Sequence, residues 1–399
     1  MFCISSWTQS SYDNKLVIFV FIFAVFAFVI ESQLTQYVQT TLNYKHPFFL
    51  FWIVHSSFAI SFPIHLAYLK LATPHSLSAI WKGLVFANAQ HLDGLDERSI
   101  KFQKSRFIIL TLKLTALISL PALFWFAAIE LAPVTDVTAI WNTNSFFVYL
   151  ISIKVFGLKL EGRKLGAVII ATCGVLAVVY GGTTTSDISK DVSVNAIPIP
   201  QSPKPLIGDV LTLIASICYA AYLVFYKKYA ALPSAPEFDE DYRPLSASDD
   251  PESNALHASH SRLEADPGLS DKVYPLPFGL YSNLWTSAIG ICTFSFFWII
   301  PILHWTGVEP FAFPSNIHTL GAIAGIVLTG CLFNVGFMIT LAFWGPIVTS
   351  VGGLLTIVLV FLSDILLGAT DSLTIWGVAG SATIVAAFGV IAYDMLQQG

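Results

Sequence analysis

Two ionisable side chains, Glu31 and Lys113, stand within apolar runs that are long enough to cross a membrane. A charge at the centre of a bilayer costs about 2.5–3.5 kcal/mol on insertion scales, so such residues usually serve a substrate, an ion or a proton. Glu31 is a candidate proton-coupling carboxylate, or else a helix-end residue at the interface. Lys113 is a candidate contact for an anion, or else its ammonium reaches the cytosolic headgroups. Their depths differ by about 12 Å at 1.5 Å per helical residue, which argues against a direct ion pair.

A second group of polar residues lies near the middle of the fourth apolar run, at Trp141, Asn142, Thr143 and Asn144. Hydrogen bonds between helices would use one or two of these side chains. Four consecutive residues surround a helix, so we expect some of them to face a solute. The predicted substrate-binding residues are Glu31, Gln33, Lys113, Trp141, Asn142, Asn144 and Asn334.

The composition indicates which elements must position these residues. The 399-residue chain is 55% hydrophobic and 11% charged, with a mean hydropathy of +0.71, far more apolar than a soluble domain. One span takes about 20 apolar residues. Ten runs fit this length: 16–38, 48–69, 106–130, 133–154, 164–182, 206–227, 276–300, 317–341, 345–367 and 373–393. We therefore expect an all-α polytopic membrane protein with ten transmembrane helices.

The first run reaches full length only with polar residues included. Its purely apolar part, Leu16 to Ile30, is too short for a bilayer, so Glu31, Gln33 and their polar neighbours must lie at membrane depth. Such groups are tolerated only against a partner or a wet space. No small-residue cleavage site follows Ile30, so we interpret this run as an uncleaved helix rather than a signal peptide.

The distribution of basic residues predicts an orientation. With the N-terminus in the cytosol, 16 of the 20 Lys and Arg residues fall on the cytosolic side, and Lys45, Lys190 and Lys204 fall on the other. Cytosolic loops are enriched in Lys and Arg. We therefore expect both termini in the cytosol and an even number of spans.

A pattern of Pro and Gly occurs twice, about 211 to 213 residues apart. Pro133, Gly157 and Gly166 correspond to Pro346, Gly368 and Gly377. Pro and Gly are common in membrane helices in any case. If the repeat is real, each half has five spans, and an odd number inverts the second half relative to the first. Inverted repeats place a substrate site at the midplane and permit alternating access. The expected parts are a first five-helix repeat (1–182), a non-cytosolic loop (183–205) and a second five-helix repeat (206–399).

A linker within the second repeat supports another interpretation. Residues 233–271 are rich in Ser, Pro and acidic residues and bury too little apolar surface to fold, so we expect a disordered cytosolic linker. Tyr242 begins a four-residue pattern with the spacing of a sorting signal, although a plain solvated linker also explains it. The chain could thus be a non-transporting receptor or a trafficking adaptor. Deleting about 237–266 would abolish that function, but would mainly change the location of a transporter.

Several kinds of chemistry have no motif in the sequence. There is no phosphate-binding loop, no C-x-x-C pair and no H-E-x-x-H helix, so we expect no enzyme, cofactor or metal. The expected partners are a small-molecule substrate and membrane lipids, with no nucleic acid. Gly162-x-x-x-Gly166 and Gly321-x-x-x-Gly325 permit close approach of helices, either within one bundle or in a homodimer.

Several motifs carry a family resemblance. The segments Glu31–Tyr37, Tyr44–Phe49, Gly208–Lys227, Pro346–Gly352 and Leu355–Ile357, with Asp364, resemble motifs of solute carrier 35 subfamily F and its fungal relatives. These belong to the drug/metabolite transporter superfamily. The stretch Trp125–Ala128 and the region 136–152 are also similar, although Ile129 stands where Asn is usual. The likeness covers most of the apolar part and neither loop.

The resemblance implies the ten-helix drug/metabolite transporter fold, with a central cavity formed by spans one to four and six to nine. Relatives carry nucleotide sugars, other phosphorylated metabolites or vitamins, and some fungal ones are thiamine-linked and vacuolar. It implies a secondary active transporter or exchanger of a small polar metabolite in an internal membrane, vacuolar or Golgi. An anionic substrate would suit Lys113, and a cationic vitamin would suit Glu31.

Overall fold

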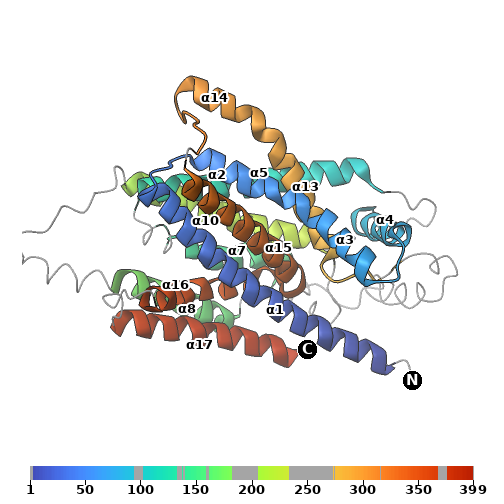
Figure 1. Ribbon diagram of the computed structural model, residues 1–399. Coiled ribbons are helices and arrows are strands. Elements are labelled where there is room, and N and C mark those ends of the chain that lie inside the picture. Colours follow the sequence, from blue (N-terminus) through green and yellow to red (C-terminus); the bar gives the residue numbers. More distant parts are fainter. Residues whose placement is uncertain are drawn as a thin grey trace, which may run out of the picture.

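The computed structural model describes residues 3–93, 102–132, 137, 140–158, 161–181, 205–232, 273, 275–314, 316–366 and 375–398. All regular secondary structure in these residues is helical (Figure 1). Apolar runs form helices in lipid because a helix satisfies its own backbone hydrogen bonds. The loop at 183–205, apart from Pro205, and the linker at 233–271 with Tyr242 lie outside the described residues.

The first part of the chain forms α1 to α8. Its elements are α1 (Cys3–Gln36), the π-helix η1 (Tyr37–Thr41), α2 (Pro47–Ser57), the 3-10 helix η2 (Phe58–Ile60), α3 (Ser61–Ala72), α4 (Leu77–Asp93), α5 (Lys104–Leu131), α7 (Asn144–Phe156) and α8 (Gly162–Gly181). The second part contains α10 (Pro205–Tyr229), α13 (Leu280–Phe294), the 3-10 helix η5 (Ser295–Trp298), α14 (Ile299–Thr306), α15 (Ile317–Gly353), α16 (Leu355–Leu366) and α17 (Ile375–Gln398).

Six helical stretches among the described residues are long and apolar enough to cross a membrane. They are Lys15–Thr41, Pro47–Ala72, Lys104–Leu131, Leu206–Tyr229, Leu280–Thr306 and Ile317–Gly353. The chain is therefore an α-helical, multi-pass integral membrane protein. The other predicted runs contain α7, α8, α16 and α17, of which α17 has a shorter apolar stretch, Ile375–Val390.

One helix was not predicted. Helix α4 lies where a cytosolic loop was expected, with Ile80, Leu84 and Ala87 buried on one face. Helix α4 contacts the chain just before α13, where Val273 N donates to the Ala79 carbonyl (3.2 Å). It also contacts the last residue of α10, since His91 Nε2 lies 3.1 Å from the Tyr229 carbonyl. This helix therefore covers the end of the bundle at which α10 ends and α13 begins (Figure 1).

The predicted boundary between the eighth and ninth runs is a break inside α15. Gly345 has φ 75° and ψ 173°, a conformation that glycine adopts and other residues avoid. Pro346 has no N–H, so the helix cannot supply the usual donor to the Ala342 carbonyl. Lys227 of α10 supplies one, since its Nζ lies 2.7 Å from that oxygen. The break is thus stabilised from a neighbouring helix.

A matching irregularity occurs at two places 211 residues apart, at Thr143 and Leu354. Thr143 N donates to Ile140 O and Phe146 N to Thr143 O, at 3.1 and 3.0 Å. Leu354 N donates to Val351 O and Ile357 N to Leu354 O, both at 3.1 Å. At each site, two successive backbone hydrogen bonds join residues three positions apart, as in a 3-10 turn, and a shorter helix, α7 or α16, begins there.

The helices pack in pairs that join distant parts of the chain. Helix α1 packs along α15, α5 along α10 and α8 along α17. Less extensive contacts join α2 to both α13 and α15, α5 to α13, α7 to both α8 and α10, and α16 to both α1 and α17. Figure 1 shows α8, α16 and α17 gathered on one side of the molecule. The first and second parts of the chain therefore interlock rather than form separate bundles.

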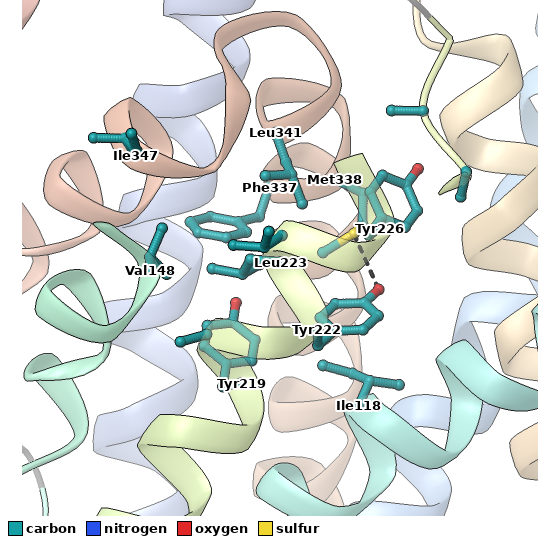
Figure 2. Packing of buried hydrophobic residues seen from close by; sticks show 14 of the residues in the cluster. Ile118, Val148, Tyr219, Tyr222, Leu223, Tyr226, Phe337, Met338, Leu341 and Ile347 are labelled. Carbon is teal, nitrogen blue, oxygen red and sulfur yellow. Dashed lines mark hydrogen bonds between the residues drawn. The ribbon is translucent and has the colours of Figure 1, made fainter. Parts of the chain in front are cut away.

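The largest buried apolar cluster among the described residues takes side chains from most of the helices, and α10 lies within it against α5, α7 and α15. Tyr222, Leu223 and Tyr226 of α10 are almost fully buried in it, and Figure 2 shows them against Met338 and Leu341 of α15. The Tyr222 hydroxyl donates to Met338 Sδ at 3.2 Å. This cluster fixes the position of α10 beside the site described next.

Candidate functional site

Glu31 is buried where α1 meets α15, with only 5% of its surface exposed. Its carboxyl lies so close to Gly330 that a methyl group on that glycine would stand 2.6 Å from Oε1 and 2.7 Å from Val54 Cγ1. Only glycine leaves room for the carboxyl there. Among the described residues, Glu31 makes no hydrogen bond or ion pair.

Asn334 shares this part of α15. Its Nδ2 donates to the Gly330 carbonyl at 2.9 Å, and the side chain is 9% exposed. The turn of α15 that seats Glu31 therefore also fixes the Asn334 amide.

A series of aromatic rings runs from α1 through the neighbouring helices. Phe28, one turn before Glu31, contacts Phe333 of α15 at 4.6 Å and Trp125 of α5 at 6.3 Å between ring centroids. Phe333 is followed by Phe337 at 5.2 Å and Phe337 by Tyr219 of α10 at 6.4 Å. Figure 2 shows Phe337 and Tyr219 on facing helices. The Glu31 carboxyl also interacts electrostatically with Tyr219.

The series ends at Trp141, whose ring lies 4.9 Å from that of Tyr219. The polar residues that follow Trp141 mainly form structural bonds. Asn144 Nδ2 donates to the Trp141 carbonyl (2.8 Å), and Thr143 Oγ1 lies 3.1 Å from Ser216 Oγ of α10. Asn142 is buried, with 5% of its surface exposed. The Trp141 ring, which is partly exposed, is thus the member of this group placed against the ring series.

Two predicted site residues lie apart from this cluster. Gln33 is two residues from Glu31, about 200° around the helix, so it points to another side of α1. Lys113 is exposed on the face of α5 that carries Ile109 and Leu120, which are 53% and 43% exposed. Its ammonium makes no hydrogen bond or ion pair with the part of the chain that the structure describes. The structure therefore places Glu31 and Asn334 together beside Gly330 of α15, and connects them to Trp141 only through the ring series. Gln33 and Lys113 lie outside this arrangement.

The arrangement suits a positive charge or a proton. A buried carboxyl without a counter-charge either takes up a proton or binds a cation, and aromatic faces attract cations and stack on planar groups. Among the described residues, no three His, Cys, Asp or Glu side chains lie together as metal ligands would.

The sequence predictions did not single out most of the rings. In the sequence, Phe28, Phe333 and Phe337 are only apolar residues of their spans, whereas Trp125 and Tyr219 are parts of motifs. The available signal was the spacing of Phe28, one turn from Glu31. The other rings come from distant segments, so their proximity depends on helix packing.

Comparisons with known proteins show the fold but no family. No family model matches the sequence, and no curated protein matches it. A solved structure named "Crystal structure of protein" is similar in fold, with a TM-score of 0.51 and 12% sequence identity. The match covers 96% of this chain and 98% of the other. At this identity the likeness concerns the fold alone.

Proposed function

We propose that this protein is a secondary active transporter or exchanger of a small polar metabolite, working by alternating access with two inverted five-helix repeats. The single observation that carries the proposal is the Glu31 carboxyl, which is buried, has no hydrogen-bond or ion-pair partner among the described residues, and lies one helical turn from a series of rings contributed by both halves of the chain. The charge distribution and the family resemblance support cytosolic termini and an internal membrane, vacuolar or Golgi.

The helix pairings support the repeat. If the ten predicted runs are numbered in order, α1 with α15 is the pair one and eight, and α5 with α10 is the pair three and six. If run one is exchanged with run six, and run three with run eight, the pair one and eight becomes the pair six and three. The pair α8 with α17, five and ten, converts into itself, and so does α2 with α13, two and seven. Such exchange is expected of two halves related by a pseudo-two-fold axis.

The two irregular turns support it as well. Thr143 and Leu354 are separated by the same 211 residues as the predicted pair Gly166 and Gly377, and they have the same hydrogen-bond pattern. Pro133 and Gly368 lie outside the described residues, so those two pairings stay predictions. Two halves of similar structure could exchange conformations at little cost in free energy, as alternating access requires.

The geometry favours one of the two charge classes left open by the sequence. Glu31 is buried beside the ring series, whereas Lys113 is exposed on an apolar face of α5. We therefore infer that the solute carries positive charge, or that a proton on Glu31 drives the movement of a neutral solute. A planar group on the solute would stack on the rings near Trp141 and Tyr219.

The test is uptake into proteoliposomes, with solutes first selected by thermal shift. Nucleotide sugars, phosphorylated metabolites and vitamins are the classes to screen, because a ligand of the folded state raises its apparent stability. The variants are Glu31→Gln, Lys113→Ala and, as a matched carboxyl outside the cluster, Glu130→Gln. We expect Glu31→Gln to reduce uptake by about tenfold or more and the other two to leave it within about twofold, because a buried counter-charge is worth more than an exposed one.

Uptake that survives both Glu31→Gln and Lys113→Ala would contradict the site. A loss in Lys113→Ala alone would instead favour an anionic solute at α5. Stimulation of uptake by an imposed pH gradient, lost in Glu31→Gln, would identify the carboxyl as the coupling group.

A further inference from the structure

Polar side chains continue along α1 beyond Glu31, and three of them have inaccessible polar atoms without a partner among the described residues. Ser32 Oγ, Thr35 Oγ1 and both amide atoms of Gln39 are inaccessible and have no hydrogen-bond partner in the described structure. Thr35 and Gln39 are 0% and 1% exposed. Proteins seldom keep buried polar groups unpaired, so each such group needs an explanation.

These side chains share one side of α1. At 100° per residue, Glu31, Ser32, Thr35 and Gln39 fall within an arc of about 100°. The earlier part of the same helix is different, since its buried residues there, such as Val17, Phe21 and Val25, are apolar. Buried polarity thus begins at Glu31 and extends toward the end of the helix at η1.

The helix itself changes at this point. Residues Tyr37–Thr41 form the π-helix η1, and Leu42 N donates to the Tyr37 carbonyl at 3.0 Å. A π-helical turn inserts an extra residue and is found mostly at functional sites. Gln39 lies within it.

Two connections that follow η1 and α14 are joined by contacts that we name the clasp (residues 44–49 and 309–313), and Val38 of η1 packs against it. Glu309 accepts Phe48 N at 2.9 Å and Phe49 N at 3.1 Å, and so caps α2. The Tyr44 hydroxyl donates to the Ala312 carbonyl at 3.0 Å. The rings of Phe49 and Phe311 are 4.9 Å apart. The clasp therefore ties the first half of the chain to the second at one end of the bundle.

We propose that Ser32, Thr35 and Gln39 line the half of the transport path that leads from Glu31 to the non-cytosolic side, a proposal that rests on the function inferred above. In this structure that half is closed by the clasp. When the clasp opens, these groups bind water and the hydroxyl or amide groups of the passing solute. Their lack of partners in the closed form is then explained, because their partners enter with opening.

Accessibility of single cysteines tests the path. The full-length protein carrying Gln39→Cys or Thr35→Cys is reconstituted into vesicles and treated with a small membrane-impermeant cationic thiosulfonate, and modification is mapped by peptide mass spectrometry. The matched control is Val25→Cys, because Val25 is also buried on α1, at 3% exposed, but lies before Glu31 in a cluster with Trp344, away from the clasp. Ser78→Cys on α4 and Val308→Cys near the clasp mark the two sides of the vesicle.

We expect modification of Gln39→Cys from the side that Val308→Cys reports, at least about tenfold faster than that of Val25→Cys. Adding Glu309→Ala should accelerate it by about fivefold, the effect of losing one helix cap on a two-state equilibrium. Retained melting behaviour shows that each variant is folded.

Equal rates at Gln39→Cys and Val25→Cys would overturn the path, as would modification from the Ser78→Cys side alone. The same conclusion follows if neither Thr35→Cys nor Gln39→Cys reacts in a protein that transports. The measurement needs no solute, so a protein that transports none of the tested compounds can still show the path. The two proposals therefore fail separately.

Discussion

The contact between Glu31 and Gly330 predicts that the same substitution has opposite effects at two places on α15. In Gly330→Ala the new methyl would lie 2.6 Å from Glu31 Oε1 and 2.7 Å from Val54 Cγ1, too close for either. Overpacking of this kind costs about 1–3 kcal/mol. Replacing a helical glycine by alanine returns about 0.5–1 kcal/mol. We therefore expect a net loss of up to about 2.5 kcal/mol, with displacement of the Glu31 carboxyl.

Gly321→Ala is the control. Nothing lies within 4 Å of a methyl group at Gly321, so only the helix-propensity gain of about 0.5–1 kcal/mol remains. In thermal melts of the purified protein, Gly330→Ala should unfold below the parent, and Gly321→Ala at or above it. Gly330→Ala should also lose uptake or ligand binding, while Gly321→Ala keeps it.

A compensating change isolates the contact. Val54→Ala removes one of the two atoms that meet the new methyl, so it should cost less in the Gly330→Ala background than in the parent. Such non-additivity is the signature of two residues in contact. If Gly330→Ala melts like Gly321→Ala, the Glu31 carboxyl does not rest on Gly330, and the assignment of the site is wrong.

Two further predictions concern the ends of helices. Lys227→Met removes the ammonium that donates to the Ala342 carbonyl in place of the N–H that Pro346 lacks, and should lower the free energy of unfolding by about 1–3 kcal/mol. Lys228→Met, whose ammonium donates to the Val155 carbonyl on the exposed side, should lower it by less, and thermal melts compare the two variants. Burial lowers the pKa of His46 from its usual 6.5, so around and below that pH this side chain binds fewer protons in the folded chain than in the unfolded chain. The stability contribution of His46 is therefore present above pH 6.5 and lost as the pH falls below it. His46→Gln should be less sensitive to acid over that window, and equal pH profiles would contradict this.

Much of the fold could be predicted because lipid imposes a simple rule on sequence. The apolar runs near Lys15–Thr41 and Lys104–Leu131 are helices, as their length and composition predicted. Helix α4 was missed because its charged surroundings resembled a loop, although Ile80, Leu84 and Ala87 have the spacing of one helical face. The break at Gly345 and Pro346 was anticipated as a boundary between runs, but its partner Lys227 was not, since 115 residues separate Lys227 from Ala342.

The site was less predictable for a physical reason. A sequence gives the depth of a side chain but not the direction in which its helix turns it. Lys113 illustrates this, because the rotation of α5 places it among the exposed residues Ile109 and Leu120. The polar residues near Trp141 illustrate a second limit. The Thr143 hydroxyl hydrogen-bonds with the Ser216 hydroxyl, and the Ser145 hydroxyl donates to the Ser350 carbonyl, so both have partners that are far away in the sequence.

If the clasp opens as proposed, the polar groups on α1 make the conformational cycle depend on water activity. Opening would hydrate the side chains of Thr35 and Gln39, whose polar atoms are inaccessible and have no partner among the described residues, so opening would take up water from the surroundings. A solute too large to enter the path, such as a long polyethylene glycol, would withdraw that water and favour closure. In a concentrated cytoplasm or a dehydrated organelle, excluded solutes would therefore slow the conformational cycle without binding to the protein.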